Sequence, residues 1–285
     1  MIKSYSKRDK MKYTLLIQCD DKKGLVYKIS KVLFENDFNI ETQQEFVDKE
    51  NNKFFFRAVI AGEVDKEKLK KEILKDVPCA DIEIFKKRKK RLFLLATKEA
   101  HALGDILIKQ YSGDLDVEII GVIANRDNLK DLVEKFSIPF YYIPAEGKSR
   151  VEHENEMLEI IRPTNPDLII LAKFMRILTP NFVEKFPNKI INIHHSFLPA
   201  FIGANPYKQA YDRGVKIIGA TAHFVNNNLD DGPIIEQDVT RVNHEMNWEE
   251  MRVQGRDIEK IVLSRAIKKA IEDRIFVYAN KTIIL

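Results

Sequence analysis

Two short segments of the chain carry the side chains that acyl chemistry requires. The first, Asn192-Ile193-His194-His195-Ser196, closes a run of alternating apolar residues, and the second, Leu229-Asp230-Asp231-Gly232-Pro233, follows another strand-like run. Asn192 supplies an amide donor, His194 an imidazole that titrates near neutral pH, and Asp230 a carboxylate that accepts a proton. Three such groups at the ends of neighbouring strands predict a catalytic centre.

The residues from position 92 onward show the pattern of a doubly wound, mostly parallel α/β domain. Strand-like and helical segments alternate, which predicts a parallel sheet covered on both faces. We expect strands at 92–97, 117–124, 140–143, 168–172 and 190–193, with helices at 103–111, 128–136, 152–161 and 181–186. Functional residues in such sheets gather outside the carboxyl ends of the strands, where Asn192 and His194 fall.

The last part of this domain positions the second segment. Two further strand-like runs, 219–225 and 234–242, flank the turn-rich loop that carries Asp230. A long apolar stripe at helical spacing predicts a helix over about 247–273 that packs on the core, and 275–278 with 282–285 predict a closing hairpin.

The residues before position 86 follow a different order of strand, helix, strand, strand, helix, strand. We expect strands at 13–18, 39–48, 54–61 and 80–85 and helices at 24–36 and 66–74, which is a ferredoxin-like βαββαβ pattern. The unbroken basic run 86–91 separates the two patterns. Because like charges repel and stay solvated, we expect an exposed linker there, not a nucleic-acid surface. The sequence thus predicts a domain at 1–85, a linker at 86–91 and a domain at 92–285.

The composition excludes several classes of protein. The 285 residues are 45% hydrophobic and 32% charged with a net charge of only +4, as in an ordinary soluble protein. No apolar stretch approaches the roughly 20 residues that a membrane-spanning helix needs. The N-terminus lacks the features of a secretory signal, and Cys19 and Cys79 show no paired-ligand spacing. We therefore expect a cytoplasmic protein with no membrane or nucleic-acid partner and no disulfide.

A dinucleotide-binding turn is not expected after the first strand of the second domain. The segment from Thr97 to Gly104 has a single, late glycine and two charged side chains, Lys98 and Glu99, where a phosphate cradle needs bare amides.

The histidines also fail to predict a metal site. His194, His195 and His223 are suitable ligand types, but adjacent strand residues face opposite sides, and no His pair has helical four-residue spacing with an intervening Glu. We expect no metal and no cofactor. The remaining three histidines lie in polar contexts and are expected at the surface: His101, His153 and His244.

Three segments around the expected centre resemble the folate-dependent formyltransferase fold: 192–204, 219–225 and 229–235. In the N-terminal part, Asp21-Lys22-Lys23-Gly24-Leu25 and Asn39-Ile40 resemble the ACT regulatory domain. An ACT-like domain joined to this module is similar to the formyltetrahydrofolate deformylases, and the resemblance covers nearly the whole chain.

The resemblance implies the hydrolysis of 10-formyltetrahydrofolate to tetrahydrofolate and formate, which feeds purine and one-carbon metabolism. The catalytic residues of the family fall on Asn192 and His194, which stabilise the tetrahedral oxyanion, and on Asp230, which handles protons. His223 is expected to orient or pack near the same pocket. Substrate-binding positions fall on two segments, where backbone groups do much of the pterin recognition: Met175, Arg176, Ile177 and Leu178, and Val225, Asn226, Asn227, Asn228 and Leu229.

The ACT resemblance implies control by a small amino acid. In that family the effector binds between paired domains, and the corresponding positions here are Asp21, Gly24, Asn39 and Ile40. Glycine or methionine is the expected effector, and a homo-oligomer the expected assembly.

The sequence departs from related family patterns at two places. The formyltransferase that modifies glycinamide ribonucleotide has a glycine-rich phosphate-binding turn after its first strand, whereas Thr97-Lys98-Glu99-Ala100 is not one, so water is the natural acceptor. Asn205 stands where a basic residue is expected in deformylases. Two alternatives remain open: formyl transfer to an unidentified amine, and a noncatalytic sensor of folate or amino acids.

Overall fold

The computed structural model describes residues 11–63, 65–200 and 205–285, and these divide into two compact units. The first unit contains the chain up to Arg88 together with 273–276 and 283–285, and the second contains 89–272 and 277–282. The predicted segment 192–204 ends with four residues outside the described ranges. Among the described residues, no helix is both long and apolar enough to cross a membrane.

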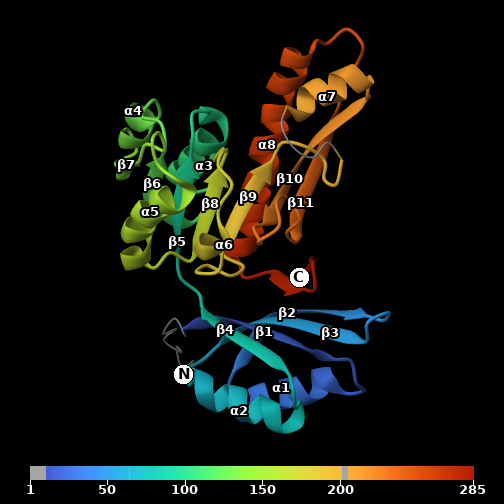
Figure 1. Ribbon diagram of the computed structural model, residues 1–285. Helices are drawn as coiled ribbons and strands as arrows, with labels where there is room; N and C mark the ends of the chain where they lie inside the picture. The colour runs from blue at the N-terminus through green and yellow to red at the C-terminus, as the bar shows by residue number, and fades with distance from the viewer. Residues whose placement is uncertain (1–10, 64, 201–204) are drawn as a thin grey trace, which may run out of the picture. The chain divides into compact units, whose positions relative to one another are not determined.

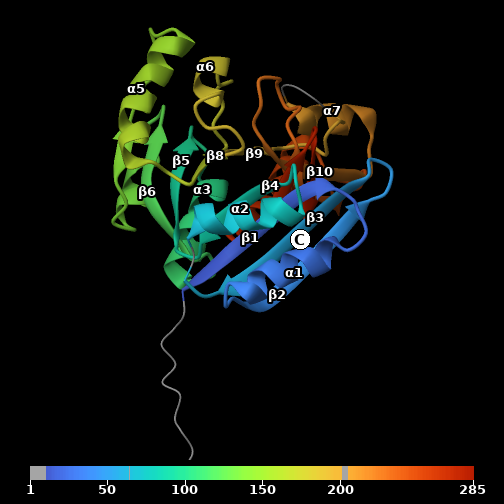
Figure 2. The same cartoon turned by 90° about the horizontal axis from the view of Figure 1, so that it is seen from below.

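The first unit is an antiparallel four-stranded sheet with two helices on one face (Figures 1 and 2). Its elements follow the predicted βαββαβ order: β1 (Lys12–Asp20), α1 (Leu25–Glu35), β2 (Asn39–Asp48), β3 (Lys53–Ala61), α2 (Lys66–Asp76) and β4 (Asp81–Lys86). The strand order is β2-β3-β1-β4. Ile17, Phe56 and Ile84 from the sheet pack with Ile29 and Ile73 from the helices in one core.

The second unit is a seven-stranded sheet between two helical layers. Its strands are β5 (Lys90–Ala96), β6 (Val117–Ala124), β7 (Phe140–Tyr142), β8 (Leu168–Ala172), β9 (Ile190–His194), β10 (Ile217–Phe224) and β11 (Ile234–Arg241). In the order β11-β10-β9-β8-β5-β6-β7, the five strands from β9 to β7 run parallel, and β10 and β11 are antiparallel to their neighbours. The predicted mostly parallel α/β sheet is therefore confirmed.

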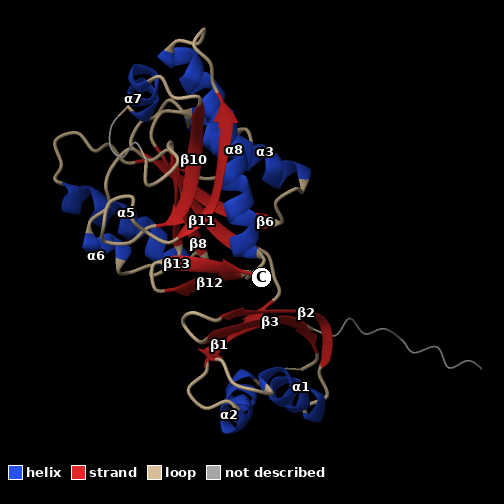
Figure 3. Cartoon of the chain, turned by 90° about the vertical axis from the view of Figure 1, so that its right-hand side faces the viewer, coloured by secondary structure: helices blue, strands red, loops and turns tan. Residues whose placement is uncertain are grey.

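The helices of this unit divide between the two faces of the sheet, as Figure 3 shows. They are α3 (Ala100–Ser112), α4 (Lys130–Glu134), α5 (Arg150–Thr164), α6 (Pro180–Val183), α7 (Pro206–Arg213) and α8 (Trp248–Ile271). α8 packs against α3, α7, β9, β10 and β11, whereas α5 and α6 share a core cluster with β5 and β8 on the other face. The chain ends in a hairpin of β12 (Ile275–Tyr278) and β13 (Lys281–Ile284).

The structure differs from the predicted boundaries in two places. Residues 86–91 are not all a solvated linker, because β4 ends at Lys86, β5 begins at Lys90, and Lys90 is only 8% exposed. Part of the C-terminal hairpin belongs to the first unit, where the Phe276 ring meets Phe55 edge-on at 5.4 Å and the Asp273 carbonyl accepts a hydrogen bond from Arg57.

One element was missed by the sequence analysis, the helix α7. Its start at Pro206 and its end at Gly214, which has a positive φ of 68°, are ordinary helix signals. Its sequence carries few apolar residues, and only Pro206, Tyr207 and Ala210 are buried.

Candidate active site

A cavity of about 730 Å³ opens at the carboxyl ends of the parallel strands of the second unit. Residues that follow β5, β8 and β9 line it, together with the loop between β10 and β11 and residues of α8. This is the edge of an open α/β sheet where ligands generally bind. Asn192, His194 and Asp230 all line this cavity, so the structure brings the three expected catalytic residues together.

The pairing of β9 with its neighbours fixes the first two residues. Asn192 and His194 are two positions apart on β9 and therefore face the same side of the sheet. In the antiparallel register, Asn192 lies opposite His223 and His194 lies opposite Thr221. The Thr221 hydroxyl donates to the Ser196 carbonyl at 2.9 Å and accepts from the Leu198 amide at 3.1 Å, which fixes the chain as it leaves β9.

His194 and Asp230 form a buried pair. Nδ1 of His194 lies 3.3 Å from Oδ2 of Asp230, and the side chains are 6% and 11% exposed. Because a carboxylate can only accept, Nδ1 carries the hydrogen of this contact. Nε2 of His194 is also buried but has no hydrogen-bond partner. One ring nitrogen is therefore held by Asp230, and the other has an unfilled hydrogen-bonding position.

The Asp230 carboxylate remains ionised at neutral pH. Burial by itself would raise its pKa, but the hydrogen bond from His194 and the electrostatic interaction with that ring outweigh burial and lower the pKa below its usual value. Asp230 adopts a positive φ of 53° in a loop that closes tightly on the end of β10. A Cβ at Gly232 would lie 1.7 Å from the Phe224 carbonyl oxygen, so only glycine permits this approach.

His223 orients Asn192. Its Nδ1 lies 2.8 Å from the Phe224 carbonyl and must therefore donate, and burial lowers the pKa of the ring, which keeps it neutral. Nε2 of His223 then accepts from Nδ2 of Asn192 at 3.3 Å. One Asn192 amide hydrogen is engaged, and the second remains for a ligand. Because the His223 ring is neutral, its 3.8 Å contact with Asp230 is not an ion pair.

Both expected substrate-binding segments line the same cavity. The loop after β8 is attached to the end of β5, because the Met175 amide donates to the Thr97 hydroxyl at 2.9 Å. Three apolar side chains in these segments, Met175, Ile177 and Leu229, are between 45% and 55% exposed. They offer apolar contact area that a flat ring system could cover.

The side chains of the asparagines in the second segment already have hydrogen-bond partners within the protein. Asn226 accepts from the Asn228 amide at 3.0 Å, and Asn227 donates to Glu184 at 3.1 Å. Their side chains thus shape the loop and leave its backbone as the contact surface.

Sequence reasoning missed a buried charged cluster that also lines the cavity. Lys173, directly after β8, lies 3.3 Å from Glu259 of α8, and Glu259 also contacts His101 of α3 and Tyr207 of α7. Lys173 and Glu259 are 5% and 1% exposed. These four residues show no regular spacing in the sequence, so no motif predicted that they would meet. The only signal in the sequence was a charged residue, Lys173, directly after the fully apolar strand 168–172.

The expected surface positions of two histidines are wrong. Nε2 of His101 donates to the Glu259 carboxylate at 2.7 Å, and the His101 side chain is 12% exposed. His153 is 1% exposed, its Nε2 lies 3.0 Å from the Ile143 carbonyl, and burial lowers the pKa of the ring. His244 is exposed as expected. Among the residues that the structure describes, no group of three or more His, Cys, Asp or Glu side chains is arranged to hold a metal ion.

The four expected effector residues lie at two ends of the first unit's sheet. Asp21 and Gly24 follow the end of β1. Asn39 and Ile40 begin β2, and Asn39 pairs with Ala61 of β3. Ala61 in turn pairs with Lys12, which lies at the start of β1. One chain does not bring these two pairs of residues together.

Comparisons with known proteins place this geometry in a family. The formyl transferase family model matches residues 90–267. A formyltetrahydrofolate deformylase from Haemophilus influenzae is 53% identical over 96% of this chain and 99% of its own. The structure of a formyltetrahydrofolate deformylase from Pseudomonas syringae matches with a TM-score of 0.92 and 38% identity, covering 97% of this chain and 95% of that one. A glycinamide ribonucleotide transformylase from Symbiobacterium toebii matches over 70% of this chain and 96% of its own, with a TM-score of 0.67 and 29% identity.

Proposed function

The chain belongs to the formyltetrahydrofolate deformylases, within the formyl transferase family, and we propose that it hydrolyses 10-formyltetrahydrofolate at Asn192, His194 and Asp230. The assignment of these residues rests on one observation. His194 lines the cavity with Nδ1 held by Asp230 and with a buried Nε2 that has no partner. A buried polar atom without a partner is costly in a folded protein, and a ligand that fills the position removes that cost.

The reaction requires a water molecule to attack the formyl carbon. A bond forms between the water oxygen and that carbon, the bond from the carbon to N10 breaks, and N10 takes up a proton, so that formate and tetrahydrofolate leave. The Asp230–His194 pair accepts the proton that water loses and returns one to N10. General acid–base help of this kind contributes roughly 100- to 10,000-fold in rate.

The tetrahedral intermediate carries a negative oxygen. The second amide hydrogen of Asn192 and the Nε2–H of protonated His194 are the two donors proposed for it. A preorganised donor of this kind typically contributes about 100- to 1000-fold in turnover. The folate itself is proposed to lie on the two segments at 175–178 and 225–229, with its ring system over Met175, Ile177 and Leu229.

The experiment is incubation of the purified protein with 10-formyltetrahydrofolate and no added amine, while tetrahydrofolate and formate are measured together. Equal release of both supports hydrolysis. Binding of the folate without release of formate would favour the open alternatives, an amine acceptor or a noncatalytic sensor. Asp231→Asn is the matched control for Asp230→Asn, because Asp231 is an exposed carboxylate in the same loop, and we expect it to retain activity.

We also propose that the first unit is an ACT-type regulatory domain that binds glycine or methionine. The βαββαβ order and the β2-β3-β1-β4 sheet support this assignment. Since Asp21 and Gly24 lie far along the sheet from Asn39 and Ile40, a site containing all four residues needs a second copy of the chain, which fits the proposed homo-oligomer. Calorimetric titrations with both amino acids test the proposal, and two flat titrations would remove its basis. A cytoplasmic enzyme of this kind would supply formate to purine and one-carbon metabolism.

A further inference from the structure

Lys173 occupies an unusual position at the exit of β8. Its backbone has a φ of 62°, in the left-handed region that costs a residue other than glycine about 1 kcal/mol or more. Its side chain is 5% exposed, although removing an ammonium group from water is expensive unless it is well paired. A strained backbone and a buried, paired side chain at one residue that lines the cavity indicate that this long side chain has a role in the cavity.

Three helices hold the partner of this ammonium group in place. Glu259 of α8 lies 3.3 Å from the Lys173 ammonium, 2.7 Å from Nε2 of His101 on α3, and accepts from the Tyr207 hydroxyl of α7 at 2.6 Å. Tyr207 in turn packs on α8 at Gly255, where a Cβ would lie 2.2 Å from its hydroxyl oxygen. Because Glu259 is held in this way, the position of the Lys173 ammonium group at the cavity wall is fixed as well.

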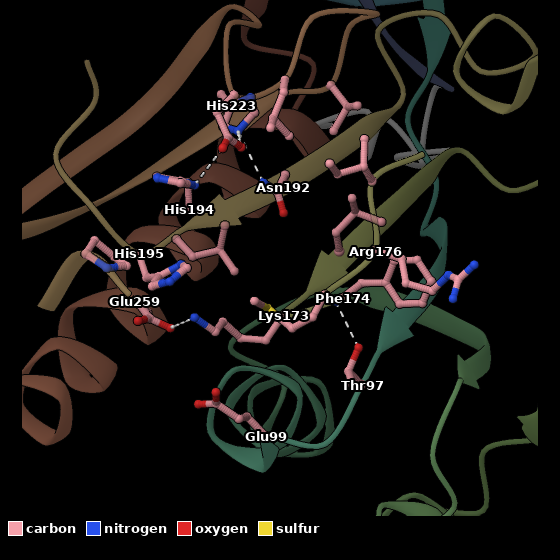
Figure 4. Close-up of a pocket in the computed structure, with 18 of the residues that line it drawn as sticks. Thr97, Glu99, Lys173, Phe174, Arg176, Asn192, His194, His195, His223 and Glu259 are labelled. Carbon is pink, nitrogen blue, oxygen red and sulfur yellow. Dashed lines mark hydrogen bonds and ion pairs between the residues drawn. The ribbon is translucent and has the colours of Figure 1, made fainter. Parts of the chain in front are cut away.

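The cavity has two different walls. The segments proposed for folate, at 175–178 and 225–229, form the first wall, and Lys173, Glu259 and Tyr207 form the second. Figure 4 shows Lys173 extending from the end of β8 towards Glu259, away from Arg176. His195 lies between the catalytic pair and this second wall, with its ring 5.3 Å from that of His194 and 5.9 Å from that of Tyr207.

The second wall also carries a carboxylate of the chain at the start of α3. Glu99 is the N-cap residue of α3, and its side chain lies 3.3 Å from Arg256 and 3.6 Å from His101. Lys98 and Arg252 line the cavity beside it.

These contacts bear on the choice between water and an amine. In the proposed reaction the formyl carbon would lie beside Asn192 and His194 with folate on the first wall, which leaves the second wall for the attacking atom. The same fold carries transformylases, whose acceptor is an amine, and an amine acceptor would need room on that side. We propose that the Lys173–Glu259 pair fills the acceptor side of the cavity and restricts the nucleophile to water. This inference rests on the proposed hydrolysis of 10-formyltetrahydrofolate.

The test is to open this wall and supply a small amine. In transfer to glycinamide, the amine nitrogen would bond to the formyl carbon, the bond to N10 would break, and the proton lost by the amine would go to N10. Lys173→Gly removes the side chain and suits the positive φ, whereas Lys173→Met removes the charge but keeps most of the volume. Glu259 keeps His101 and Tyr207 as partners in both variants.

The readout is the ratio of N-formylglycinamide to formate, measured by mass spectrometry with 10-formyltetrahydrofolate and glycinamide present. We expect no N-formylglycinamide above the detection limit from the native protein or from Lys173→Met, and from Lys173→Gly a ratio at least about tenfold above that limit. The ratio does not depend on how much total activity a variant retains.

Two results would overturn the inference: formylation of glycinamide by the native protein, or an unchanged ratio in Lys173→Gly. The first result is measured on the native protein and needs no variant. If Lys173→Gly folds poorly, Lys173→Ser also removes most of the side chain and can replace it in the assay. The proposed function fails separately, when the native protein releases no formate from 10-formyltetrahydrofolate in the absence of any amine.

Discussion

Replacement of Glu259 by glutamine is expected to destabilise the second unit strongly, because this carboxylate is the common partner of three side chains. Burial would raise its pKa, but the hydrogen bond from His101, the charge of Lys173 and the Tyr207 hydroxyl lower it to about 2, against an ordinary value of 4.5. At roughly 1.4 kcal/mol per pKa unit, ionised Glu259 contributes about 3 kcal/mol at neutral pH. The variant also leaves a buried Lys173 without its charge partner, and breaking such a pair typically costs about 3 to 5 kcal/mol.

The pH dependence gives this prediction a sign. The pKa of Glu259 is lower in the folded protein than in the unfolded chain, so its contribution is complete above about pH 4.5 and is lost as the pH falls through 2. The difference in unfolding free energy between the native protein and Glu259→Gln should therefore fall from about 3 kcal/mol at pH 7 to about 2 kcal/mol at pH 3.5.

Urea unfolding followed by tryptophan fluorescence measures this difference directly. Trp248 is the one tryptophan of the chain and lies at the start of α8, the helix that carries Glu259. The double variant with Lys173→Met should be less destabilised than Glu259→Gln alone, because it leaves no buried charge unpaired. A loss below about 1 kcal/mol at pH 7, or a double variant no more stable than the single one, would refute the reasoning.

Three further changes test other contacts of the site. Asp230→Asn should lower turnover about 100- to 10,000-fold while folate binding survives, since an amide keeps the shape of the side chain but accepts no proton; steady-state formate release and a binding titration measure the two effects. Burial and the Lys173 charge lower the pKa of His195 to about 4, so its neutral ring contributes stability that is complete above pH 6.5 and is lost as the pH falls through 4. Urea titrations should show that His195→Phe flattens this dependence by about 2 to 3 kcal/mol. Gly232→Ala should displace the Asp230 loop, because its Cβ would meet the Phe224 carbonyl, and we expect loss of formate release with native circular dichroism.

The sheet of the second unit could be predicted from the sequence because most of its strands are continuous runs of apolar residues. Strands buried on both faces need such runs, and the alternation with helices determines that they are parallel. Parallel strands share one carboxyl edge, so Asn192 and His194 were placed there without knowledge of strand order. Asp230 was expected at the same edge because its loop follows another strand-like run, and in the structure that loop reaches the site through the antiparallel strand β10.

The charged wall of the cavity was not predictable by the same means. Lys173, Glu259, His101 and Tyr207 come from the exit of β8 and from three helices, and their pairing depends on how those helices pack. His101 was expected at the surface because its neighbours in the chain are polar. The polarity of neighbouring residues in the sequence does not show which buried group of another helix packs against a residue such as His101.

The cavity holds two carboxylates with lowered pKa values, and their surroundings assign them different tasks. Asp230 is 11% exposed and lies 3.3 Å from Nδ1 of His194. Glu259 is 1% exposed and is held by an ammonium group, an imidazole and a phenol hydroxyl. The pKa of that Tyr207 hydroxyl is raised by burial and by Glu259, so it keeps its proton. Both carboxylates contact an imidazole, but Asp230 has more access to a ligand than Glu259 does. Glu259 is therefore suited to hold the Lys173 side chain in place, which would separate the proposed proton chemistry at Asp230 from the proposed exclusion of acceptors at Lys173.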